Sequence, residues 1–133
     1  MPTDLILADS SAWVEFLRGT GSPIDHRVES MVRARTLVVT EPVLIELLAG
    51  ARDREEWRDV RRMTSAFDFA SVENPGDWID AAALYRQMRG AGRTIRNIVD
   101  CLIAVVAMRI DAAVLHKDAD FDAIAEVAPL KLA

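Results

Sequence analysis

Several structural classes are excluded by what the sequence lacks. It contains one cysteine among its 133 residues, so it can form neither an intramolecular disulfide nor a cysteine-based zinc site. No apolar run approaches the roughly 18 residues of a membrane-spanning helix. The N-terminus also lacks the basic region and long apolar stretch of a secretion signal. We therefore expect a soluble, cytoplasmic protein with no membrane segment.

Positive charge is also scarce. The chain has 16 lysines and arginines against 21 aspartates and glutamates, which gives a net charge of -5. This balance excludes a protein that binds nucleic acid through an overall positive charge, but it allows local basic patches. Because 51% of the residues are hydrophobic, the chain can bury a core. Its length predicts a single globular domain over residues 1–133.

Short apolar runs alternate with helical patterns along the chain. Strands are predicted at 5–8, 37–39, 67–72 and 112–115, with an edge strand at 129–132. Helices are predicted at 12–17, 24–32, 43–49, 53–66, 78–89, 97–110 and 121–127. Thr40 is predicted to cap the third of these helices. This alternation predicts an α/β domain of three layers, α/β/α, around a mostly parallel sheet of four to five short strands.

The helix predicted at 97–110 is apolar around its whole circumference. Eight consecutive residues, Cys101 to Met108, are uncharged and almost wholly apolar. Such a helix is buried on most sides by the rest of the fold. Asp100 stands at its start, where a carboxylate suits the helix dipole but also lies near the core. A charge in that position needs a partner, and a metal ion is a frequent one.

Asp100 is one of four acids in apolar surroundings. Asp9 and Asp118 each follow a predicted strand, and the ends of parallel strands meet at one edge of a sheet, where ligands bind. Glu46 is the only charged residue in its predicted helix, and Asp120 follows two residues after Asp118. Asp9 could simply cap a helix, Asp100 could serve its helix dipole, and Asp118 and Asp120 could serve a turn. No local structural role is evident for Glu46.

Taken together, the acids indicate a metal site. Several carboxylates at one edge would repel each other unless they were protonated or neutralised by a cation. Ligands that offer only oxygen point to Mg²⁺ or Mn²⁺ rather than to Zn²⁺. Carboxylate clusters that hold such ions serve the hydrolysis of phosphodiesters by metal-activated water.

Four sequence segments carry a resemblance to a known family. They are Asp-Ser-Ser-Ala-Trp at 9–13, Ile-Glu-Leu-Leu-Ala-Gly at 45–50, Asp-Cys-Leu-Ile-Ala at 100–104 and His-Lys-Asp-Ala-Asp-Phe-Asp-Ala-Ile-Ala at 116–125. In this order and spacing the chain resembles a PIN-domain protein, and more narrowly a VapC-type toxin of a type II toxin–antitoxin pair. The resemblance implies a PIN-like fold and a metal-dependent endoribonuclease that cuts structured RNA, often a transfer RNA. It also implies a homodimer that a cognate antitoxin protein silences.

The resemblance also assigns roles to individual residues. The catalytic, metal-binding acids would be Asp9, Glu46, Asp100 and Asp118, with Asp120 as an auxiliary metal ligand. Within this set, Glu46 would bind a second ion or position water. One of Ser10 and Ser11 would orient a ligand or a water molecule. The cofactor would be Mg²⁺, with Mn²⁺ as an alternative.

Two other functions are open at this point. One is an aspartyl-phosphate phosphoryl-transfer domain with Asp9 as nucleophile, although Ser11 stands where dehalogenase-like folds carry a second acid. The other is a degenerate PIN-like module that only binds a partner, although none of the four acids is missing. Arg93 and Arg96 precede Asp100 closely and could contact RNA or a partner.

A second group of arginines precedes them, at Arg52, Arg54, Arg58, Arg61 and Arg62. Acids stand among these arginines, so a solvated, ion-paired helix face is the favoured interpretation and contact with RNA phosphates the alternative. Trp57 and Trp78 lie in polar helices, and either could belong to an interface with a partner.

Overall fold

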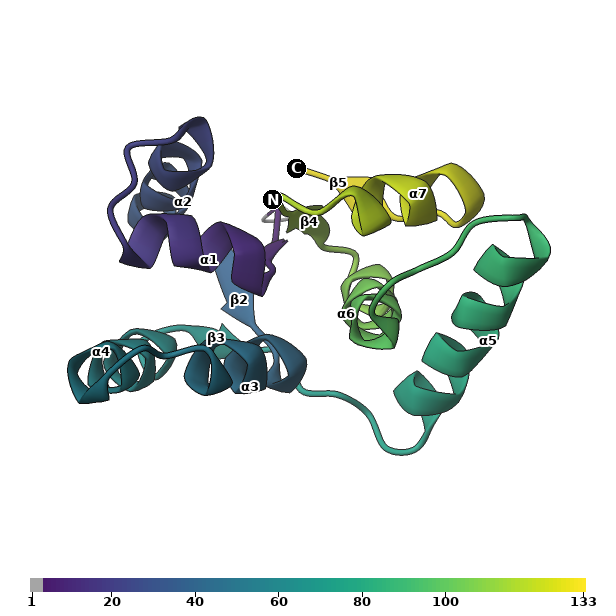
Figure 1. Ribbon diagram of the computed structural model, residues 1–133, viewed down its shortest axis with the longest axis horizontal. Helices are drawn as coiled ribbons and strands as arrows, with labels where there is room; N and C mark the ends of the chain where they lie inside the picture. The colour runs from purple at the N-terminus through teal and green to yellow at the C-terminus, as the bar shows by residue number, and fades with distance from the viewer. Residues whose placement is uncertain (1–3) are drawn as a thin grey trace.

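A parallel five-stranded sheet forms the centre of the molecule, in the strand order β3-β2-β1-β4-β5 (Figure 1). The structure is a computed structural model that describes residues 4–133. The strands are β1 (Ile6–Ala8), β2 (Leu37–Val39), β3 (Asp68–Phe69), β4 (Ala113–Leu115) and β5 (Lys131–Leu132). The helices are α1 (Ser10–Leu17), α2 (Pro23–Ala34), α3 (Glu41–Ala49), α4 (Arg54–Thr64), α5 (Gly76–Gly90), α6 (Ile98–Arg109) and α7 (Ala119–Val127).

The helices lie on both sides of this sheet. Figure 1 shows α1 and α2 together on one side and α5 and α6 on the other. Every strand pair in the sheet is parallel, as the alternation of strand and helix predicts. The three-layer α/β/α architecture predicted from the sequence is therefore confirmed. Among residues 4–133, no helix has both the length and the apolar character needed to span a membrane.

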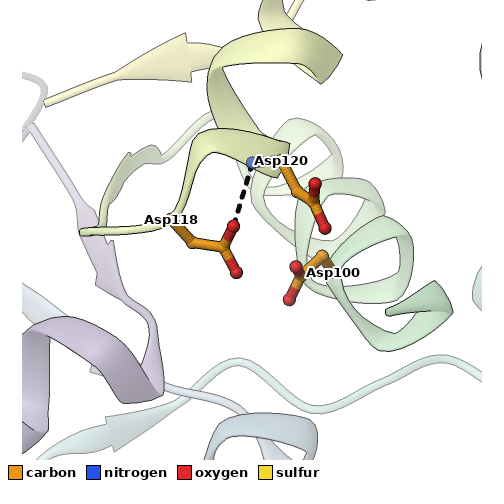
Figure 2. Close-up of side chains that lie close together, drawn as sticks. All are labelled: Asp100, Asp118 and Asp120. Carbon is orange, nitrogen blue, oxygen red and sulfur yellow. Dashed lines mark hydrogen bonds between the residues drawn. The ribbon is translucent and has the colours of Figure 1, made fainter. Parts of the chain in front are cut away.

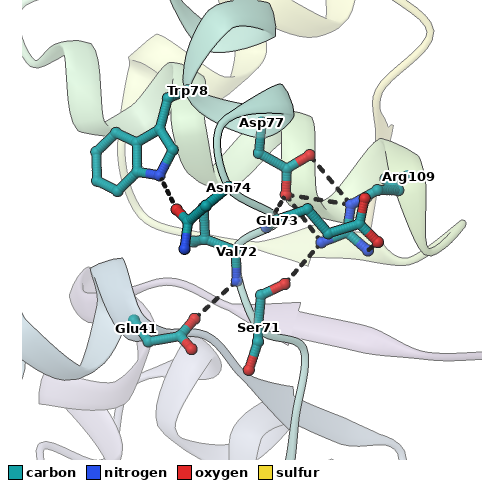
Figure 3. A network of polar contacts seen from close by, with 8 residues as sticks. All are labelled: Glu41, Ser71, Val72, Glu73, Asn74, Asp77, Trp78 and Arg109. Atoms are coloured by element: carbon teal, nitrogen blue, oxygen red, sulfur yellow. Dashed lines mark hydrogen bonds and ion pairs between the residues drawn. The ribbon is translucent and has the colours of Figure 1, made fainter.

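The third strand is shorter than predicted. A strand was expected over 67–72, but β3 covers only Asp68 and Phe69 at the edge of the sheet. The Ala70 N–H still donates to the Val39 carbonyl of β2, but from Ser71 onward the backbone bonds to side chains, as Figure 3 shows. The N–H of Val72 donates to the Glu41 carboxylate at 2.9 Å, and the carbonyl of Ser71 accepts from the Arg109 guanidinium at 2.8 Å. These contacts draw the chain away from the sheet toward α5.

Helix α6 lies in the core, as its sequence predicts. Each residue from Asp100 to Ala107 is buried, and the helix contacts α5, α3, α7 and β4. Asn97 caps it, because its side-chain oxygen accepts the N–H of Val99 at 3.0 Å. Burial raises the pKa of the Cys101 thiol to about 11, which makes it an unreactive part of the core.

The carboxyl ends of β1 and β4 lie side by side. Ala8 pairs with Leu115 in the parallel ladder, and the N–H of Asp9 donates to the Leu115 carbonyl at 3.0 Å. Thr40 follows the neighbouring strand β2 and occupies the N-cap position of α3. The expected cap by its hydroxyl is wrong, because the Thr40 oxygen is buried and has no hydrogen-bond partner among the described residues.

Candidate metal centre

Three helices begin near the edge formed by the ends of β1 and β4. Asp9 is the N-cap of α1, Asp118 is the N-cap of α7, and Asp120 lies in the first turn of α7. Asp100 lies in the first turn of α6. A helix N-terminus carries partial positive charge, so all four carboxylates stand where the backbone favours an anion. Glu46 joins them from the middle of α3.

Three of the acids form a tight group. Asp100, Asp118 and Asp120 each offer a carboxylate oxygen, and these oxygens all lie within 4.8 Å of one another. Figure 2 shows the three carboxylates turned toward a common space. Asp118 Oδ1 also accepts the N–H of Asp120 at 2.9 Å, which fixes the turn between them. The sequence suggested Asp120 only as an auxiliary ligand, yet its carboxylate belongs to the tightest cluster.

The Asp100 carboxyl is the most perturbed group of the site. Its side chain is buried, with 4% of the residue exposed, and Oδ2 has no hydrogen-bond partner among residues 4–133. Burial raises the pKa of Asp100 to about 8, and the nearby charges of Asp118, Asp9 and Glu46 add to this effect. At neutral pH the carboxyl therefore keeps its proton unless a cation replaces it.

Asp9 serves the helix and the site together. Its Oδ1 accepts the Ser11 hydroxyl at 2.6 Å and the Ala12 N–H at 3.1 Å, so the capping role considered from the sequence is real. Its Oδ2 accepts no hydrogen bond from the described residues and can bind an ion. Burial raises the pKa of Asp9, and the two hydrogen bonds only partly offset that effect.

Glu46 is held from two sides. The Ser10 hydroxyl donates to Oε1 and the Asn97 amide donates to Oε2, each at 3.3 Å. Burial raises the pKa of Glu46 despite the Ser10 contact, and the charge of Asp9 raises it further. Since Asn97 also caps α6, it connects the helix that carries Asp100 to the carboxylate of Glu46. Sequence reasoning missed this role, and the only available signal was a capping residue three positions before Asp100.

The loop that carries Asp118 is positioned by neighbours from α1 and α7. The Ser11 hydroxyl accepts the N–H of Lys117 at 2.9 Å. The ring of His116 accepts the N–H of Asp118 at 3.0 Å through Nδ1 and packs on Phe121 with ring centroids 5.2 Å apart. These contacts are those of a residue that orients Asp118.

The two arginines before Asp100 have different partners. Arg93 forms an ion pair with Glu126 of α7 at 2.5 Å. The guanidinium of Arg96 lies at the acid cluster, 3.6 Å from Asp118 and 3.9 Å from Asp120.

On α4 and just before it, the predicted ion pairs form in part: Arg52 with Glu56 at 2.9 Å and Arg62 with Asp59 at 3.6 Å. Arg54, Arg58 and Arg61 form no ion pair within the described chain.

The donor set suits a hard divalent cation. Every side chain of the cluster offers oxygen, and its most buried member has an oxygen without a hydrogen bond. Mg²⁺ usually takes one or two carboxylates together with water, and Mn²⁺ accepts the same ligands. Such an ion would also offset the burial and the carboxylate repulsion that together raise the pKa of Asp100.

Comparison with known proteins gives a consistent result. Residues 6–127 match the family model described as PIN domain. "Ribonuclease VapC11" from Mycobacterium tuberculosis is 40% identical over 131 residues, which cover 97% of this chain and 98% of that protein.

Solved structures share the fold at low sequence identity. A DNA-bound VapBC from Salmonella typhimurium has a TM-score of 0.78 and 13% identity, and the match covers 98% of this chain and 97% of that one. VapBC-5 from M. tuberculosis, a member of the VapBC family of toxin–antitoxin systems, has a TM-score of 0.64 and 21% identity, with 98% of each chain covered.

Proposed function

This chain belongs to the PIN-domain family and, within it, to the VapC ribonucleases, and from that membership and its acidic site we propose that it is a metal-dependent endoribonuclease. It acts as the toxin of a type II toxin–antitoxin pair and cuts structured RNA, with transfer RNA as one candidate substrate. The observation that carries the proposal is the buried Asp100 carboxyl, which lies in one cluster with Asp118 and Asp120 and has an oxygen with no hydrogen-bond partner among the described residues. A structural acid in the core would be paired, whereas an acid that awaits a cation is not.

The proposed ligands divide into two sets. Asp9, Asp100 and Asp118 hold one or two divalent ions, and Asp120 supplies an additional oxygen. Glu46 binds a second ion or positions the attacking water. When bound, Mg²⁺ or Mn²⁺ supplies a water of lowered pKa and stabilises negative charge on the phosphate.

The remaining polar residues keep these carboxylates in place. Ser11 fixes one oxygen of Asp9 and leaves the other free for an ion. Ser10 and Asn97 hold the two oxygens of Glu46 from opposite elements, α1 and the start of α6. Rigid support of this kind lowers the cost of organising the site when substrate arrives.

A cognate antitoxin protein is the proposed regulator. Solved relatives of this fold include members of toxin–antitoxin systems, and the VapC relatives are ribonucleases. A ribonuclease that attacks the cell's own structured RNA must be held inactive, and a partner that covers the acid cluster would do so. Because the proposed substrate is the cell's own RNA, the cytoplasm is the proposed location of the protein.

A homodimer is the proposed assembly, supported by an exposed apolar patch beside the site. Ile45, Trp78, Ile79 and Ile98 are each more than half exposed. Ile45 and Trp78 line a hollow of about 410 Å³ together with Val99, and Ile79 and Ile98 adjoin these lining residues in sequence. Exposed apolar side chains gathered from α3, α5 and α6 mark an interaction surface. Since α3 and α6 also carry Glu46 and Asp100, a second copy docked here would flank the metal centre.

A cleavage assay tests the proposed function. Purified protein is incubated with total cellular RNA and with individual transfer RNAs in Mg²⁺, in Mn²⁺ and in chelator, and the new RNA ends are sequenced. We expect defined cuts that require the ion and that disappear in Asp9→Asn and Asp100→Asn while both variants stay folded. Asp80→Asn, an exposed acid on α5, is the matched control and should cut normally. Full cleavage by both site variants would refute the assignment.

A further inference from the structure

The segment from Arg93 to Asn97 passes beside the acid cluster with a fixed backbone. Ile95 is buried, and the N–H of Arg96 donates to Asp120 Oδ2 at 3.0 Å. On either side of these two residues, Arg93 pairs with Glu126 and Asn97 donates to Glu46. The Cα of Arg96 is therefore held at a defined place on the rim of the site.

The side chain of Arg96 is free by comparison. It is 76% exposed, and its nitrogens approach Asp118 and Asp120 no closer than 3.6 and 3.9 Å. These separations are too long for good hydrogen bonds, and an exposed pair of this kind contributes little to folding. The contact is the electrostatic attraction of an exposed cation to a cluster of acids.

Arg96 and a metal ion would compete for the same carboxylate oxygens. The described residues show no other ion pair to Asp118 or Asp120, so Arg96 is their only observed cationic partner. A divalent ion bound by these carboxylates offsets part of their negative charge and repels the guanidinium, so the attraction that holds the Arg96 side chain there becomes weaker. The side chain can then turn from a fixed backbone toward an anion that arrives at the same rim. A guanidinium binds phosphate with two parallel hydrogen bonds, so an RNA phosphate is the anion that fits.

We propose that Arg96 binds an RNA phosphate next to the metal centre, and that an ion bound by Asp118 and Asp120 releases its side chain to do so. This inference rests on the proposed function and names the residue through which the site holds its substrate. Arg93, three residues earlier, has no such role because it is paired with Glu126.

Two measurements on Arg96→Ala, Arg96→Lys and Arg93→Ala test this. The affinity for a labelled structured RNA is measured by fluorescence anisotropy in Ca²⁺ over a range of salt concentrations. We expect Arg96→Ala to weaken binding about tenfold and to reduce the salt slope by roughly 0.7 to 0.9, the loss of one phosphate contact. Arg96→Lys should keep the slope and lose part of the affinity, and Arg93→Ala should match the wild type.

Calorimetry with Mn²⁺ in the absence of RNA is the second measurement. Since Arg96 competes with the ion, Arg96→Ala should bind Mn²⁺ as tightly as the wild type or up to about fivefold more tightly. Weaker Mn²⁺ binding would show that Arg96 merely supports the acids and would overturn the inference. An unchanged RNA salt slope, or an effect confined to a protein partner, would also overturn it.

Cleavage is scored separately in Mn²⁺. A wild type that binds RNA but never cuts it would overturn the proposed function, while the binding data would still decide the role of Arg96. A wild type that binds no RNA would overturn both.

Discussion

The carboxylates of Asp100 and Asp118 face one another with oxygens within 4.8 Å, although one begins a buried helix and the other ends a loop. Burial makes Asp100 harder to ionise, and the charge of Asp118 adds to this, so the pKa of Asp100 rises to about 8. A proton and a metal ion are therefore alternatives at Asp100.

Metal affinity should depend on pH through Asp100. Because the carboxyl must lose its proton to bind an ion, the apparent affinity for Mn²⁺ should rise as the pH rises from about 6 to 8, and then level off. Calorimetry in buffers of different ionisation enthalpy should detect proton release on binding near pH 7. Asp80→Asn should reproduce the wild-type profile. An affinity that is flat over this range in the wild type would contradict the raised pKa.

The stability of the metal-free protein should carry the same signature. The unfolded chain ionises Asp100 near its ordinary pKa of 3.8, whereas the folded protein keeps the proton up to about pH 8. The folded state thus binds more protons in this window, so the Asp100 contribution to stability declines as pH rises through it. The difference in free energy of unfolding between Asp100→Asn and the wild type should therefore shift in favour of the variant by at least ~1 kcal/mol when the pH is raised from 4 to 8. Thermal unfolding of both proteins in chelator at pH 4 and at pH 8 measures this shift. The same stability difference at the two pH values would contradict the raised pKa of Asp100.

A second buried acid behaves in the opposite way. Asp77 of α5 is buried, yet three hydrogen bonds of 2.9 to 3.1 Å join it to the Arg109 guanidinium (Figure 3). Burial alone would raise the pKa of Asp77, but the Arg109 contacts outweigh it and the pKa lies below its ordinary value. The stability that this pair contributes is present above pH 4 and is lost as the pH falls through the lowered pKa.

Removing the arginine should therefore be costly. Arg109→Ala leaves the buried Asp77 charge with the Glu73 N–H but without its cationic partner, and should lower the free energy of unfolding by about 3 kcal/mol at pH 7. Arg33→Ala breaks an exposed pair with Glu29 and should cost no more than about 0.5 kcal/mol. Urea unfolding of both variants makes the comparison. Equal effects would mean that Asp77 and Arg109 form an ordinary surface pair.

These two acids illustrate what the sequence could and could not predict. The sequence alone singles out Asp9, Asp100 and Asp118 as candidates because each stands at the boundary of an apolar element, and Glu46 because it is alone in its helix. Asp77 gave no such signal, since an acid after Asn-Pro-Gly has the sequence of an ordinary turn. Its partner Arg109 lies on another helix, and contacts between distant side chains leave no periodic pattern. The contacts of Asn97 with Glu46 and of Arg96 with Asp118 were hidden for the same reason.

The apolar patch gives a prediction about assembly. We expect the wild type to be a dimer by analytical ultracentrifugation and Trp78→Arg, a change at the hollow, to be a folded monomer, because burying a charge in an apolar interface without a partner is costly. Trp57→Arg changes a similarly exposed apolar side chain on α4 and should leave the dimer intact. A wild-type monomer, or dissociation by both substitutions, would contradict the assignment of this patch.

Asn97 has two separable functions, since its oxygen caps α6 and its amide nitrogen holds Glu46. Asn97→Ala removes both and should lose about 1 kcal/mol of stability together with RNA cleavage activity. Asn97→Ser keeps a capping oxygen but is too short to replace the amide that reaches Glu46. The serine variant should therefore unfold close to the wild-type temperature while its kcat falls roughly tenfold, or about 1.4 kcal/mol. Full activity of Asn97→Ser would mean that the site needs Asn97 only as the cap of α6. The contact with Glu46 would then have no role in cleavage.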